Sequence, residues 1–185
     1  MSPDGTRLVF KEQFPKTGWD LMVLTLDNER NAQPLAQTAF AELDGEVSPD
    51  GRWLAYQSNE SGRDEVYVRP FPDVGAGRWQ VSNGGGADPL WAHSGLELFY
   101  RGPTGAVMAA LVERSVSFAV STPARLFDGP YYAGGGAILG RTYDVSPDDR
   151  RFLMIKVGGS DQATSANLVV VQHWTEALKR LVPAN

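Results

Sequence analysis

The sequence contains no cysteine and only two histidines among its 185 residues. The lack of cysteine excludes disulfides, thiolate metal sites and a cysteine nucleophile, and it fits a cytoplasmic or a periplasmic protein equally well. No apolar run approaches the roughly 20 residues that a membrane-spanning helix needs. The first residues, MSPDG, show no basic-then-apolar signal pattern. The net charge of −5 argues against a nucleic-acid backbone or an anionic membrane as the main partner. We therefore expect a soluble protein that neither binds nucleic acid nor inserts into a membrane.

The sequence is rich in turn-forming residues and contains an internal repeat. Its 20 glycines and 12 prolines, with few segments of helical periodicity, favour β-strands joined by turns. Four segments share one pattern, and they are SPDGTRLVF (2–10), SPDGRWLAY (48–56), AHSGLELFY (92–100) and SPDDRRFLM (146–154). Their spacing matches the length of a four-stranded propeller blade. The sequence thus predicts an all-β fold, a single β-propeller domain over 1–185, with blade repeats at about 2–47, 48–91, 92–145 and 146–182.

The SPDG unit has a physical explanation as a hairpin turn. Pro49 presets its own φ angle, Asp50 can accept hydrogen bonds from local backbone, and Gly51 tolerates a left-handed conformation. The innermost strand of each blade should end just before this turn. The predicted inner strands are 43–47, 87–91 and 141–145, the predicted third strands are 20–26, 65–71, 106–112 and 167–173, and the predicted outer strands are 33–37, 78–82 and 124–127. Residues 174–182 are predicted to form a short C-terminal helix.

These residues resemble the TolB-like, WD40-like propeller repeats, in particular the C-terminal propellers of bacterial eukaryotic-type serine/threonine kinases. The resemblance rests on runs such as SPDGRWLAYQSNESGRDEVYVRPFP, WAHSGLELFY and NLVVVQHWTEALKRLV and covers essentially the whole chain. The GxGxxGxV, HRD and DFG signatures of a kinase domain are absent from the sequence. The resemblance therefore implies a propeller fragment of a kinase-like receptor, without the kinase.

The two ends of the repeat array predict unpaired strand edges. The first repeat begins at its SPDG turn and has no inner strand, and the fourth is followed by the predicted helix instead of an outer strand. Bare edges are rare in natural proteins. Four repeats can close as a four-bladed ring, or two half-rings can associate as a homodimer that pairs both edges. We expect the homodimer.

Polar residues on the predicted inner strands and their turns would surround the central channel. Asp44, Glu46, Asp88 and Asp144 could bind a divalent cation, and their oxygen ligands favour Ca²⁺. Together with His93 and Asp88 as catalytic residues, such a site could hydrolyse a lactone, ester or phosphotriester. The alternative is that no cofactor binds and these residues are polar only because a water-filled channel passes them.

Two hypotheses of function follow. The first is a non-catalytic sensor module that binds a protein or small-molecule ligand as part of a larger kinase-like receptor. The second is a calcium-dependent hydrolase with its site in the central channel.

Overall fold

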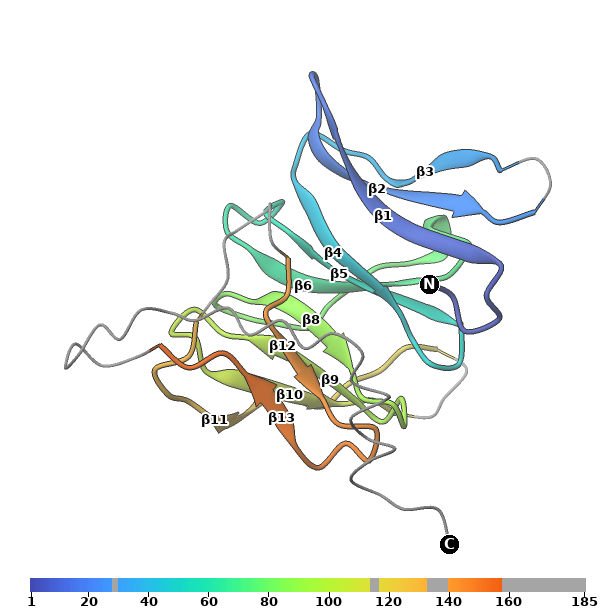
Figure 1. Cartoon of the computed structure of the whole chain (residues 1–185). Helices are drawn as coiled ribbons and strands as arrows, with labels where there is room; N and C mark the ends of the chain where they lie inside the picture. The colour runs from blue at the N-terminus through green and yellow to red at the C-terminus, as the bar shows by residue number, and fades with distance from the viewer. Residues whose placement is uncertain (28–29, 114–116, 133–139, 158–185) are drawn as a thin grey trace, which may run out of the picture.

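The structure, a computed structural model, describes residues 1–27, 30–113, 117–132 and 140–157, which form four antiparallel sheets (Figure 1). The first sheet contains β1 (Arg7–Phe14), β2 (Gly18–Thr25) and β3 (Ala32–Ala36). The second contains β4 (Glu42–Val47), β5 (Trp53–Ser58), β6 (Glu65–Pro70) and β7 (Trp79–Gln80), with the 3₁₀ turn η1 (Val74–Ala76) between its last two strands. The third contains β8 (Ala87–Trp91), β9 (Glu97–Arg101), β10 (Val107–Leu111) and β11 (Ala124–Phe127), and the fourth contains β12 (Tyr143–Val145) and β13 (Phe152–Met154).

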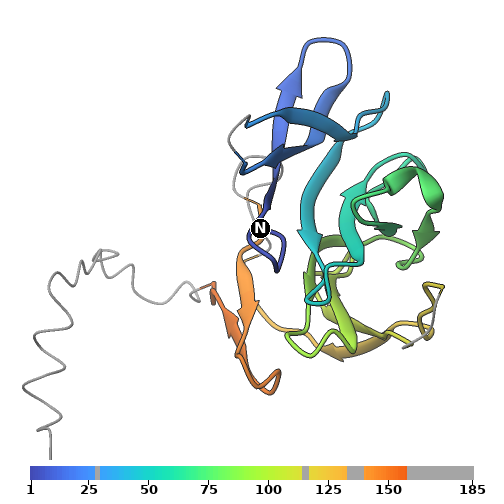
Figure 2. The ribbon, with the colours of Figure 1, turned by 90° about the vertical axis from the view of Figure 1, so that its right-hand side faces the viewer.

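The sheets follow one another around a common centre, as the blades of a propeller do (Figure 2). In the second and third sheets the strands run outward from the inner strand in chain order, β4-β5-β6-β7 and β8-β9-β10-β11. The first sheet has the order β1-β2-β3, and its first strand follows the SPDG turn. This confirms the all-β, partial-propeller fold predicted from the repeats. The predicted strand 167–173 and helix 174–182 lie outside the described residues. Within the described ranges, no helix is long and apolar enough to cross a membrane.

The SPDG turns show why the repeat sets the blade register. The Ser48 hydroxyl accepts a hydrogen bond from the Trp53 amide at 3.0 Å and donates one to Asp50 at 2.5 Å. The Asp50 carboxylate accepts the Arg52 amide at 3.1 Å. The same three bonds recur in the turns at 2–7 and 146–151. In the fourth turn Asp149 takes the left-handed position, with φ 57°, that Gly51 occupies in the second with φ 74°.

The predicted inner strands agree closely with those observed. Residues 87–91 match β8, and 43–47 begins one residue after the start of β4. Strand β12 begins at Tyr143, two residues later than the predicted 141–145, and Arg141 precedes it, with its side chain in a contact between blades described below.

The hydrophobic core lies between sheets rather than within one. The first and second sheets enclose Leu21, Leu54 and Tyr56. The second and third enclose a larger aromatic cluster that includes Trp53 and Trp91. The third and fourth enclose a cluster whose buried members are Leu90, Ala92, Phe99, Ala109, Tyr143 and Val145. Each sheet is thus held by apolar burial against its neighbours.

Candidate functional site

The inner strands β4 and β8 carry a bulge at the same point of the repeat. Pairing with the next strand shifts register between Leu43 and Glu46 in one blade and between Ala87 and Leu90 in the other. At these bulges Asp44 has φ 51° and Asp88 has φ 54°. A left-handed conformation is uncommon for residues other than glycine, and such strain tends to occur where structure redirects a side chain. Here the two bulges bring two carboxyl groups together.

Asp44 and Asp88 form a coupled acidic pair. Burial of Asp88, followed by the charge of Asp44 and a hydrogen bond between the two side chains, raises the pKa of Asp88 to about 6, although the positive charges of Arg101 and Arg141 act in the opposite direction. The Lys11 ammonium lies 3.6 Å from the Asp44 carboxylate. Asp88 therefore keeps its proton at mildly acidic pH, and the negative charge beside it is partly neutralised by a lysine from the first blade.

Glu46 joins three blades. Its carboxylate accepts the Trp91 amide at 3.0 Å and the Arg141 guanidinium at 3.1 Å, while the Trp91 indole donates to the Glu46 backbone carbonyl at 3.1 Å. Arg141 also donates to the Pro89 carbonyl at 2.9 Å. Burial raises the pKa of Glu46, and the charge of Arg141 opposes that rise. Glu46 thus serves as an acceptor between inner strands of the second, third and fourth blades.

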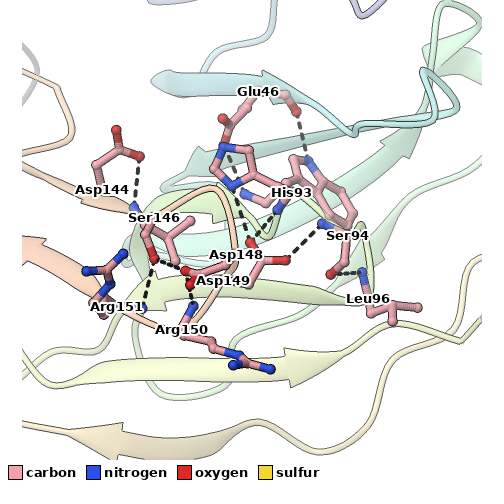
Figure 3. Close-up of polar contacts among 12 residues, drawn as sticks. Glu46, His93, Ser94, Leu96, Asp144, Ser146, Asp148, Asp149, Arg150 and Arg151 are labelled. Carbon is pink, nitrogen blue, oxygen red and sulfur yellow. Dashed lines mark hydrogen bonds and ion pairs between the residues drawn. The ribbon is translucent and has the colours of Figure 1, made fainter. Parts of the chain in front are cut away.

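Asp144 lies on the exposed side of β12. Successive side chains of a strand point to opposite faces, and the neighbouring Tyr143 is buried, with its hydroxyl donating to the Asp88 carbonyl at 2.8 Å. Burial holds the pKa of Tyr143 well above its usual value. The Asp144 carboxylate accepts the Val145 amide at 2.9 Å (Figure 3). Asp144 therefore lies on the face of β12 opposite Tyr143, and its charge adds to the rise in the pKa of Glu46.

The four predicted calcium ligands are not brought together as one set. Asp44 and Asp88 meet, Glu46 is paired with Arg141, and Asp144 lies on the other face of its strand. Within the part of the chain that the structure describes, no three histidine, aspartate or glutamate side chains are grouped so that they could hold a metal ion. Lys11 and Arg141 supply positive charge beside these acids. The calcium site stays a prediction.

The structure places the two predicted catalytic residues at opposite ends of β8. Asp88 is near the start of the strand and His93 follows its end, a separation of roughly 16 Å at about 3.3 Å per residue. His93 instead contacts the fourth blade (Figure 3). Its amide and its ring Nδ1 lie 2.7 Å and 3.2 Å from one oxygen of Asp149, and the Ser94 amide donates to the other at 2.9 Å. Although partial burial acts against them, these bonds lower the pKa of Asp149.

The contact between His93 and Asp149 occupies the place where a proline and a glycine face each other between the other turns. A Cβ atom added at Gly51 would lie 3.8 Å from Pro3, and one added at Gly95 would lie 3.8 Å from Pro49. His93 stands at the proline position of the third turn and Asp149 at the glycine position of the fourth. Sequence reasoning singled out His93 but missed its partner. One signal in the sequence could have found it. The third and fourth turns both depart from SPDG, and they do so at the proline and glycine positions that face each other between the other turns.

Three further cationic or polar residues, at one repeated position of the second strand, escaped sequence reasoning. Lys11 reaches Asp44 of the next blade, and Gln57 accepts the Asp88 amide of the next blade at 3.3 Å. Arg101 occupies the same position in the third blade. Its side chain is only 3% exposed, and its guanidinium forms no hydrogen bond with the described residues. Arg101 acts on Asp88 through charge.

Comparison with known proteins identifies the fold. Neither a protein-family model nor a curated protein matches the chain. Among solved structures, the "putative TolB from Agrobacterium tumefaciens" matches with a TM-score of 0.52 and 16% identity over 67% of this chain and 48% of that one. A "putative 6-phosphogluconolactonase from Bacteroides uniformis" matches with a TM-score of 0.54 and 16% identity over 83% of this chain and 45% of that one. The chain thus spans about half the length of these structures, and its fold is that of a TolB-like β-propeller.

The raised pKa of Asp88 predicts a pH-dependent effect of Asp88→Asn. Well below its ordinary pKa of 3.8 the carboxyl group is protonated in both the folded and unfolded states and has no effect on stability. Between its ordinary pKa of 3.8 and its folded pKa of about 6 the unfolded state loses the proton first, so folding becomes less favourable as the pH rises. At pH 7 ionised Asp88 lowers the free energy of unfolding by up to about 3 kcal/mol. Because asparagine cannot ionise, the variant should gain stability relative to the wild type between pH 4 and 7.

Urea denaturation at each pH measures this difference, with Asp144→Asn, on the exposed side of β12, as the control. A difference between Asp88→Asn and the wild type that does not change with pH would contradict the buried acidic pair.

The exchanged turn contact predicts a favourable coupling between positions 93 and 149. His93→Pro alone removes an amide donor to Asp149, and Asp149→Gly alone removes the acceptor of the His93 and Ser94 amides. We expect His93→Pro to destabilise the protein by about 1 kcal/mol. Asp149→Gly should cost less, because glycine adopts the left-handed conformation of this position more readily. The double substitution recreates the proline–glycine contact of the other turns, so it should cost less than the sum of the two.

A double-mutant cycle by urea denaturation checks this coupling. Additive effects of the two substitutions would show that the residues do not compensate for one another.

Proposed function

We propose that this chain is a non-catalytic binding module that recognises a protein or small-molecule ligand. The observation that carries this proposal is the use of the inner-strand acids as links between blades. Glu46 is bound by Arg141 and Trp91, and Asp44 lies beside Lys11 and Asp88. Acids used in this way stabilise a rigid scaffold, and rigid scaffolds favour binding because little order is lost when a ligand docks.

The resemblance of the SPDG repeats to propellers of bacterial eukaryotic-type kinases supports a place for this module within a larger receptor. In that setting the propeller would bind the signal and another domain would respond to it. A fold by itself does not specify a function, so this placement rests on the sequence motifs.

A calcium-dependent hydrolase of lactones, esters or phosphotriesters is the second candidate. The observation that favours it is the Asp44–Asp88 pair, because a carboxyl group with a pKa of about 6 can accept and donate a proton near neutral pH. A cation held by Asp44, Glu46 and Asp88 would have to displace Lys11 and Arg141 from these acids. That displacement makes the hydrolase the weaker candidate.

Hydrolysis assays separate the two candidates. We expect the purified protein to hydrolyse p-nitrophenyl acetate, δ-valerolactone and diethyl p-nitrophenyl phosphate no faster than buffer, with no change on adding Ca²⁺ or EDTA. Asp88→Asn and Glu46→Gln should give the same background rates. Turnover that requires Ca²⁺, stops with EDTA and is lost in both variants would overturn the binding module in favour of the hydrolase.

We further propose that two copies of the chain associate. The outward face of β13 and the residues after it presents apolar side chains, with Leu153 75% exposed and Ile155 54% exposed. The opposite face of the same sheet packs on the third blade through Tyr143, Val145 and Phe152. A propeller sheet normally packs on both faces, so a sheet from a second copy is a suitable cover for the exposed one.

Light scattering tests this association. A homodimer should have about twice the mass of the 20.1 kDa chain, and Leu153→Glu should shift the mass to that of one chain. A wild-type mass of about 20 kDa at micromolar concentration would reject the homodimer.

A further inference from the structure

A pocket lies at the outer edge of the second blade, away from the inner-strand acids. It has a volume of about 440 Å³ and is lined by Phe40, Glu60, Ser61, Tyr67, Arg78 and Gln80. This volume falls within the range of ordinary ligand sites. Neither the turns nor the acidic pair contributes to it.

Four chain segments build the pocket. Phe40 comes from the link between β3 and β4, and Glu60 and Ser61 come from the loop between β5 and β6. Tyr67 belongs to β6, and Gln80 belongs to β7, just after Arg78. Within the described residues β7 is an edge strand, because it pairs only with β6. An edge strand offers backbone N–H and C=O groups that an extended peptide can use.

Arg78 is held in a fixed orientation at this pocket. Its guanidinium forms an ion pair with the Glu60 carboxylate and lies over the Tyr67 ring, 5.4 Å from the ring centroid. The side chain is nevertheless 47% exposed. A guanidinium has five N–H donors, and Glu60 is the only hydrogen-bond acceptor that Arg78 has among the described residues. Arg78 therefore has donors left for a second acceptor, and their orientation is largely fixed before a ligand arrives.

Phe40 adds an apolar surface to the same pocket, and 43% of its side chain is exposed. Aromatic side chains and arginine are enriched at the energetic centres of protein–protein interfaces. A carboxylate is the group that best matches the fork of N–H donors on a guanidinium. The pocket thus combines an anion-binding group, an apolar contact and an adjacent strand edge.

We propose that this pocket binds an extended peptide segment of a partner protein, with an acidic side chain on Arg78 and a neighbouring apolar side chain on Phe40. This inference deepens the proposed binding function and rests on it. The peptide backbone lies along β7, which supplies affinity that is independent of sequence. Arg78 and Phe40 select the side chains.

Selection from a phage-displayed library of random 12-residue peptides on the intact protein tests this pocket. We expect the selected sequences to place aspartate or glutamate beside an apolar residue. Fluorescence anisotropy with a labelled selected peptide should show binding to Arg78→Gln that is weaker by about tenfold or more, since a charge-assisted hydrogen bond contributes that much. Binding to Phe40→Ala should weaken by a similar factor, because an apolar contact is lost. Arg78→Lys keeps the charge without the planar fork and should give an intermediate loss.

Arg125→Gln is the matched control, because Arg125 is also an exposed arginine in an ion pair, with Asp128 at 3.1 Å in the third blade. Its binding should equal that of the wild type. Circular dichroism checks that each variant is folded.

Selected peptides that lack acidic residues, or that bind Arg78→Gln as tightly as the wild type, would overturn the pocket while leaving the binding module intact. A library that yields no binder to the wild type would also overturn it. The hydrolysis assays above test the proposed function separately.

Discussion

The hydrogen-bonded serine–aspartate turn, which recurs in the first, second and fourth repeats, is the interaction on which the fold depends. In the second blade the Ser48 hydroxyl satisfies the amide of the buried Trp53 and also binds Asp50. These bonds fix the residue at which the inner strand ends and the next one begins. Since side chains alternate between the two faces of a strand, a change of one residue would turn the side chains that pack on one neighbouring blade toward the other. The turn therefore decides which apolar residues meet between blades.

Because this interaction is contained within six residues, most of the fold could be predicted from the sequence. The repeated turn sequence predicts the register of each blade, and the predicted inner strands begin within one or two residues of the observed ones. The β-bulges at Asp44 and Asp88 could not be predicted in the same way. A bulge depends on how the strand pairs with its neighbour. The dipeptides Asp44-Gly45 and Asp88-Pro89 are local signals of irregular backbone, but they do not reveal which strand pairing they interrupt.

The same holds for the candidate site: residues could be selected from their place in the repeat, but their partners in other blades could not. Sequence reasoning selected Asp44 and Asp88 because both lie on inner strands, and the structure places them side by side. The cationic groups that act on them include Lys11, beside Asp44, and Arg141, which belong to other blades, and Arg101, whose charge acts on Asp88. The spacing of residues along the chain does not reveal such pairs. His93 was selected because it breaks the repeat, yet the break reflects a substituted contact with Asp149.

The bond between Arg141 and Glu46 has a consequence for the order of folding. These residues are 95 positions apart in the sequence, whereas the hairpins within each blade pair strands that are close along the chain. The entropy lost in closing a loop rises with its length, so the local hairpins can form well before distant contacts become favourable. Arg141 also needs the Pro89 carbonyl of the third blade in place. The fourth blade should therefore dock last, onto a template that the second and third blades have already assembled.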